Sequence, residues 1–393
     1  MNQSLLLHVI ERLESFASKL PTTIQKPILN ELTPLKELFL RQRSPRFVFV
    51  GSNKIPLPQL VSTIFATAAP DQDPDAATKD SSWSELKLKD RGSVAVLDAR
   101  RAEKATSLQE KLEQQPADVV LFVDNGESAP GRRKGDIDDL IKCLDSNDRA
   151  GGTAKIIVAV IPSAKSGSSR GREHDKNISD DYTARIRSIL DSKPTIRDHI
   201  LDVVTFANSD STEDAQKLMS ILARELPNEA RIEMIRISRD SEGQHQVAQV
   251  LVKSTTAICT AIGAQPIPLA DMPILTTLQL VMVSGIMYIS GRERSMRAAT
   301  EFVGALGANV GIGMLLREGT RAILKFFPGW GNVVCGMVAG AGTYAMGRAA
   351  IAFFLEGASI QEARKTYLAS RKRPQRPLLL GRKKQKTRSA RAK

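Results

Sequence analysis

Residues 46–58 of the chain have the sequence RFVFVGSNKIPLP. The run Arg46–Val50 is almost wholly apolar, as expected for a β-strand that helices cover on both faces. Gly51 follows it and begins a loop that contains Pro56 and Pro58. A buried strand that ends in such a loop predicts the first strand of an α/β domain.

Further short apolar runs alternate with amphipathic helical patterns as far as residue 227. Strands are expected at Arg46–Val50, Leu86–Lys89, Ser93–Asp98, Asp118–Asp124, Lys155–Ile161 and Asp202–Ala207. Strands that alternate with helices predict βαβ units, and therefore a six-stranded, mostly parallel sheet.

The second of these strands differs from the others. Leu86–Lys89 alternates strictly between leucine and lysine, which is typical of a strand with one solvent-exposed face at a sheet edge. Only residues 90–92 separate it from Ser93–Asp98, so these two strands are expected to form an antiparallel hairpin.

This order of elements resembles the small-GTPase fold of the Era and TrmE type over residues 46–227. In that family the first strand leads into G-x-x-x-x-G-K-[ST], in which backbone N–H groups and the lysine bind phosphates and the hydroxyl binds Mg²⁺. Only Gly51 matches, since Pro56, Leu57 and Pro58 occupy the positions of the second glycine, the lysine and the hydroxyl. Lys54 lies three residues after Gly51, too early for the phosphate-binding lysine.

The other nucleotide motifs are altered as well. The family's D-x-x-G reads Asp98-Ala99-Arg100-Arg101, its N-K-x-D reads Pro162-Ser163-Ala164-Lys165, and its Ser-Ala reads Ala207-Asn208. The resemblance therefore implies a vestigial nucleotide site of Gly51, Lys54 and Asp98, with no catalytic residue, no cofactor and no GTP hydrolysis. The competing hypothesis is a divergent GTP- and Mg²⁺-binding enzyme that uses Lys54 and Asp98 differently.

Four regions are expected along the chain. They are N-terminal helices at 1–45, broken at Pro21 and Pro45, the degenerate GTPase-like domain at 46–227, a hydrophobic all-α domain at 228–370 and a basic disordered tail at 371–393. The proline-rich segment Gly263–Asp271 and the helix expected after Pro273 resemble the uncharacterised helical domain joined to Era-type GTPases in YcjF-like membrane proteins.

The helical region has few charges. Asp271 is the only charged residue between Ser254 and Gly291, and the segment Phe326–Gly347 has none. Two G-x-x-x-G spacings, Gly307/Gly311 and Gly336/Gly340, allow close helix contact, as at membrane pairing faces. These features favour membrane insertion or firm peripheral attachment. A soluble bundle is the alternative, because the polar residues of one helix lie on one arc of its surface. That arc comprises Thr276, Thr277, Gln279, Ser284 and Ser290.

The positive charge lies at the C-terminal end. Thirteen Lys or Arg residues and no Asp or Glu occur from Arg364 to Lys393, which equals the formal net charge of +13. The basic residues proposed to contact a polyanion are Arg371, Lys372, Arg373, Arg382, Lys383, Lys384 and Lys386. Such a segment attracts anionic lipid headgroups or RNA phosphates, and the absence of aromatics after Tyr367 disfavours base stacking.

Together these features predict a non-catalytic, GTPase-like scaffold or regulator at the cytoplasmic face of a membrane. Its GTPase-like domain would bind a protein partner, while its helical domain and tail would contact the anionic membrane surface. A soluble cytoplasmic location and an RNA- or ribosome-associated role are the alternatives. The three cysteines and four histidines have no metal-ligand spacing, so no metal site is expected.

Overall fold

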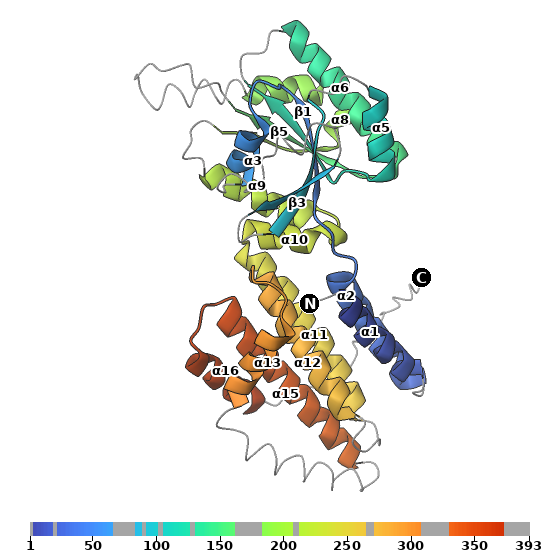
Figure 1. Ribbon diagram of the computed structural model, residues 1–393, viewed down its shortest axis with the longest axis vertical. Coiled ribbons are helices and arrows are strands. Elements are labelled where there is room, and N and C mark those ends of the chain that lie inside the picture. The colour runs from blue at the N-terminus through green and yellow to red at the C-terminus, as the bar shows by residue number, and fades with distance from the viewer. Residues whose placement is uncertain are drawn as a thin grey trace, which may run out of the picture.

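The structure is a computed structural model with an α/β half and a helical half (Figure 1). It describes residues 3–18, 22–65, 83–88, 92–100, 105–125, 130–161, 183–206, 212–264, 271–307 and 330–372. The strands are β1 Arg46–Gly51, β2 Ser84–Leu88, β3 Gly92–Asp98, β4 Val119–Asp124, β5 Lys155–Val160 and β6 Ile200–Thr205.

The helices of the α/β half cover its sheet, and those of the helical half pack on one another. The α/β half contains α3 Leu57–Phe65, α5 Ala105–Gln114, α6 Pro130–Arg149, α8 Pro194–Arg197, α9 Thr212–Glu225 and α10 Asn228–Ser238. The helical half contains α1 Gln3–Ser18, α2 Thr22–Phe39, α11 Ser241–Gly263, α12 Asp271–Ile289, α13 Met296–Gly307, α15 Trp330–Phe354 and α16 Ile360–Lys372.

The sheet has six strands in the order β2-β3-β1-β4-β5-β6. Strand β2 pairs with β3 in the antiparallel direction, and the other neighbouring pairs are parallel. The predicted α/β class is therefore confirmed, including the single antiparallel pair at one edge. The alternating burial of β2 agrees with its expected exposed face.

Helices cover both faces of the sheet. Successive residues of β1 point to opposite faces, as in any pleated strand. Phe47 and Phe49 pack in a core with α3, α9 and α10, whereas Val48 and Val50 pack with α5, α6 and α8. Because β1 is buried on both faces, its sequence from Phe47 to Val50 is continuously apolar.

Helices α1 and α2 lie in the helical half, the chain enters the α/β half at β1, and it returns to the helical half at α11. Ile10 of α1 and Leu32 of α2 share one core with residues of α11, α12 and α15. Sequence periodicity predicted the N-terminal helices without indicating where they pack. In the structure they belong to the core that residues 241–372 build.

A glycine stripe of α15 packs against α11. A Cβ atom at Gly336 would lie 2.9 Å from the Thr260 carbonyl oxygen, and one at Gly340 would lie within 2.1 Å of Thr260 Oγ1. This G-x-x-x-G pair therefore brings two helices of the same chain into close contact. Gly311, of the other spacing, lies outside the described residues.

The polar arc of α12, which favours a bundle helix, lies partly inside the helical half. Ser284 is fully buried, and Gln279 Nε2 donates a 2.9 Å hydrogen bond to Thr343 Oγ1 of α15. The amide of Gln279 therefore faces α15 within the helical half.

No helix among the described residues is long and apolar enough to cross a membrane. At the C-terminal end, α16 extends through Arg371 and Lys372, which were assigned to the tail. The remaining proposed polyanion contacts, from Arg373 to Lys386, lie outside the described residues.

Candidate functional site

The altered phosphate loop begins at Gly51, where β1 passes close to β4. Gly51 has a φ of 101°, and a Cβ atom there would lie 2.5 Å from the Val123 carbonyl oxygen. The next residue, Ser52, donates its backbone N–H to that same oxygen at 2.8 Å. Glycine is needed at this position for the approach of the two strands, independently of any phosphate.

The position of the family's lysine faces the protein core. Leu57 begins α3 and is buried with Leu60 and Phe65 in the core under the sheet. Pro58 occupies the first turn of α3 and lacks an N–H group, so this turn offers one donor fewer to an anion. At the positions where the resemblance would place phosphate ligands, this loop therefore has residues that build the core and start the helix.

Arg100 occupies the space beside the loop, and its side chain is only 1% exposed. Its Nε and Nη2 donate to the two carboxylate oxygens of Asp98 at 2.8 and 2.7 Å. Its Nη1 donates to the Ile55 carbonyl oxygen at 2.7 Å and lies 3.5 Å from that of Ser52. One side chain therefore joins the end of β3 to both sides of the altered loop.

The electrostatic polarity of the site is opposite to that of a phosphate-binding loop. A phosphate-binding loop directs N–H donors at an anion, whereas here two loop carbonyl oxygens face a guanidinium cation. Both oxygens of Asp98 are engaged by Arg100. Among the described residues, no group of three or more His, Cys, Asp or Glu side chains could hold a metal ion.

Gly51, Lys54 and Asp98, which the resemblance assigns to a nucleotide site, lie near one another in the fold but make different kinds of contact. Gly51 and Asp98 lie at the ends of β1 and β3, which are paired in parallel. Lys54 is exposed on the loop, and its backbone N–H lies 3.4 Å from Ser52 Oγ. The altered guanine motif Pro162–Lys165, the pair Ala207-Asn208 and Arg101 all lie outside the described residues.

Sequence reasoning missed Arg100. In the resemblance, Arg101 stands at the family's glycine position and Asp98 at the position of a Mg²⁺ ligand, while Arg100 matches no motif residue. An arginine two residues after an aspartate is too common a pattern to indicate an ion pair. The pairing becomes evident only when β3 is placed beside the loop after β1.

The strand order and the loop after β1 define a P-loop-like α/β fold, followed by a helical region. No protein-family model matches the chain. The chain is similar to magnetosome membrane protein 22 of Magnetospirillum gryphiswaldense, with 28% identity over 128 residues. The match covers 31% of this chain and 64% of that relative, so less than two thirds of the relative's length is spanned.

Proposed function

We propose that this chain is a non-catalytic, GTPase-derived scaffold or regulator that acts at a membrane surface. The observation that best supports the loss of nucleotide chemistry is the buried Arg100–Asp98 pair. Its guanidinium binds loop carbonyls where a GTPase would need donors for phosphate. An arginine held by a bidentate carboxylate and a carbonyl is a stable arrangement, and a triphosphate would have to disrupt it.

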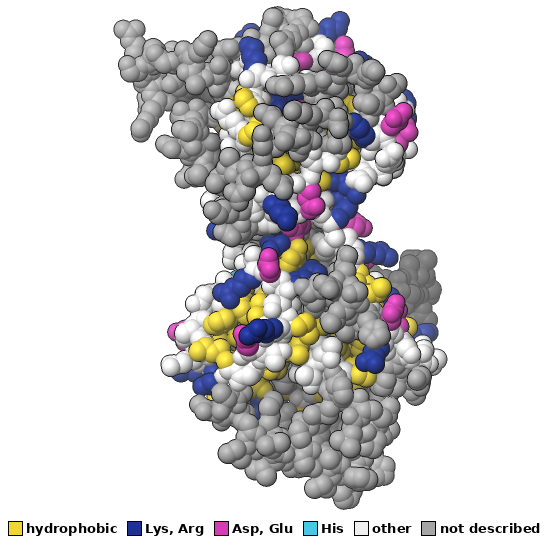
Figure 2. Space-filling view, viewed as in Figure 1, with side chains coloured by type: hydrophobic (Ala, Val, Ile, Leu, Met, Phe, Trp, Pro, Cys, Tyr) yellow, Lys and Arg dark blue, Asp and Glu magenta, His cyan; other side chains and the backbone are white. Residues whose placement is uncertain are grey.

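The membrane part of the proposal draws on surface composition and on the relative. Among described residues, the large hydrophobic side chains that are clearly exposed are Leu7, Ile189, Val250, Met337 and Leu368, of which all but Ile189 belong to the helical half. In the view of Figure 2, hydrophobic side chains likewise gather on the helical half. A chain that has both exposed apolar side chains and a strongly basic sequence segment suits an anionic bilayer surface. The relative's name, which includes the words membrane protein, agrees with this location.

A nucleotide titration tests the first part of this proposal. We expect no saturable, Mg²⁺-dependent binding of a fluorescent GTP analogue to the full-length protein at concentrations up to about 100 μM, because the loop lacks the donors and the lysine of a phosphate site. The Lys54→Ala variant should give the same trace as the wild type. Micromolar Mg²⁺-dependent binding that Lys54→Ala abolishes would instead establish the divergent enzyme.

Vesicle flotation tests the second part. We expect the full-length protein to float with phosphatidylserine-containing vesicles at low salt and to be released as salt increases. Replacing Arg382, Lys383, Lys384 and Lys386 with glutamine should weaken binding by well over tenfold, at about 1 kcal/mol for each basic residue near the surface.

A set of exposed arginines provides the matched control for flotation. Arg187, Arg197, Arg224 and Arg297 are exposed in the structure, and their replacement by glutamine removes the same charge from outside the tail. Equal losses for the two variants would argue against a specific role of the tail. Failure of the wild type to float, together with salt-sensitive co-sedimentation with RNA, would replace the membrane partner with a nucleic acid.

A further inference from the structure

Helix α10 of the α/β half lies next to the helical half (Figure 1). The carboxylate of its Glu233 contacts residues of both halves. Glu233 is 6% exposed. Its Oε1 accepts the backbone N–H of Ser93 in β3 at 3.0 Å, and its Oε2 accepts the hydroxyl of Tyr288 in α12 at 2.5 Å. Arg236, one turn further along α10, donates to Oε1 at 3.3 Å.

The antiparallel edge of the sheet provides space for this carboxylate. Gly92, the first residue of β3, has a φ of 128°, and a Cβ atom there would come within 2.3 Å of Glu233 Oε1. A residue with a side chain would be strained by the backbone angle and would also displace the carboxylate. The glycine thus permits the hydrogen bond that Ser93 donates to Glu233 of α10.

Two arginines enclose the tyrosine on the helical side. The guanidinium carbons of Arg236 and Arg294 lie 4.2 and 4.0 Å from the centre of the Tyr288 ring. Burial, with the nearby charge of Glu233, raises the pKa of Tyr288 to about 12, so the phenol keeps its proton and donates at neutral pH. Arg236 Nη2 also donates to the Gly291 carbonyl oxygen at 3.4 Å, beyond the end of α12.

We propose that Ser93, Glu233, Arg236 and Tyr288 form a latch that couples the β2–β3 edge of the sheet to the end of α12. The buried carboxylate of Glu233 depends on all of its donors, because each lost hydrogen bond leaves part of its desolvation cost without compensation. The set is therefore expected to open as a unit. A partner that displaces the β2–β3 edge would weaken the hydrogen bond between Tyr288 and Glu233. A displacement of α12 would in turn weaken the hydrogen bond between Ser93 and Glu233. This coupling does not depend on whether a nucleotide binds.

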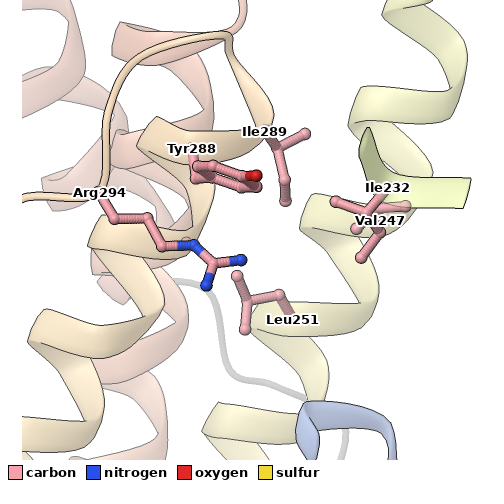
Figure 3. Close-up of a pocket in the computed structure, with 7 residues that line it drawn as sticks. Ile232, Val247, Leu251, Tyr288, Ile289 and Arg294 are labelled. Atoms are coloured by element: carbon pink, nitrogen blue, oxygen red, sulfur yellow. The ribbon is translucent and has the colours of Figure 1, made fainter. Parts of the chain in front are cut away.

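A small cavity adjoins the latch on the helical side. It has a volume of about 10 Å³, room for roughly one water molecule, and Tyr288 and Arg294 line it together with Ile232, Val247, Leu251, Gly285 and Ile289 (Figure 3). The tyrosine thus borders unfilled space, whereas most interior side chains are closely packed.

Hydrogen exchange of the full-length protein tests the latch at both ends. Tyr288→Phe removes one hydroxyl and keeps the ring that the arginines enclose. We expect amide exchange at the start of β3, including Ser93, to become about tenfold faster, together with faster exchange at residues 286–292. Glu233→Gln, which removes the charge at similar size, should accelerate exchange at the same two places.

Tyr344→Phe is the matched control, because it makes the same chemical change on α15, at a half-buried residue of the helical half. It should leave exchange at β3 unchanged. The latch is refuted if Tyr288→Phe and Tyr344→Phe give the same exchange at β3, or if both latch variants alter the helical half alone.

Discussion

Replacing Arg100 with alanine is expected to destabilise the α/β half by about 3–5 kcal/mol. The substitution leaves the Asp98 carboxylate, whose side chain is 10% exposed, without its bidentate partner. It also removes the donor that the Ile55 carbonyl oxygen receives. For a domain of this size the loss corresponds to a decrease of roughly 10 °C in melting temperature.

Tryptophan fluorescence during urea unfolding measures this loss in the correct half. The chain contains two tryptophans, and Trp83 packs against the core of the α/β half. In a Trp330→Phe background, fluorescence therefore reports this half alone. Arg197→Ala is the matched control, because Arg197 forms an exposed ion pair whose loss should cost under about 1 kcal/mol.

The double variant Asp98→Ala/Arg100→Ala shows whether the two side chains act as a pair. It should be destabilised by less than the sum of the two single variants, because removing both charges leaves neither one buried alone. Strict additivity, or an Arg100→Ala variant as stable as Arg197→Ala, would contradict the role assigned to Arg100. The stability of Arg100→Lys should lie between that of the wild type and that of Arg100→Ala, since lysine keeps the charge and loses the planar guanidinium.

Replacing Gly51 with alanine is expected to be the second severe change, at about 3 kcal/mol or more. The backbone angle alone costs an L-residue roughly 1–3 kcal/mol. The new methyl would also meet the Val123 carbonyl oxygen at 2.5 Å, which is backbone of the adjacent strand and cannot move aside cheaply. The same urea experiment, monitored through Trp83, measures the effect.

Gly151→Ala separates the cost of the backbone angle from the cost of the contact with a neighbouring strand. Gly151 also has a positive φ, of 77°, but a Cβ atom there would meet nothing within 4 Å. This variant should therefore show the conformational cost alone, about 1 kcal/mol. If the two variants are equally stable, the contact with Val123 is unimportant and Gly51 is present only for its backbone angle.

Gly51 and Arg100 contact opposite sides of the same loop. Gly51 sets the spacing between β1 and β4, and Arg100 joins the loop to the end of β3. Both features stabilise the fold without a ligand. Under the proposed function the old site is a structural support, and the surfaces of the domain remain for partners.

Periodicity predicted the sheet well because its signal is local. Each of the six expected strands overlaps an observed one, with ends that differ by a few residues. The lysine–leucine alternation of β2 indicated an edge strand, and the short connection indicated its antiparallel partner. These features depend on which face of a strand is exposed to solvent, and the alternation of polar and apolar residues along the strand shows that directly.

The sequence by itself also determined that the loop after β1 lacks the ligands of a phosphate-binding loop, since Pro56, Leu57 and Pro58 cannot supply two N–H groups, a charge and a hydroxyl. Only the tertiary structure decided which contacts these positions make instead. Arg100 meets Ile55 across 45 residues, Tyr288 meets Glu233 across 55, and α1 and α2 join a core built mainly after residue 240. Such contacts depend on how complete helices and strands pack against one another. A local pattern of polar and apolar residues does not indicate which distant residue a side chain will contact.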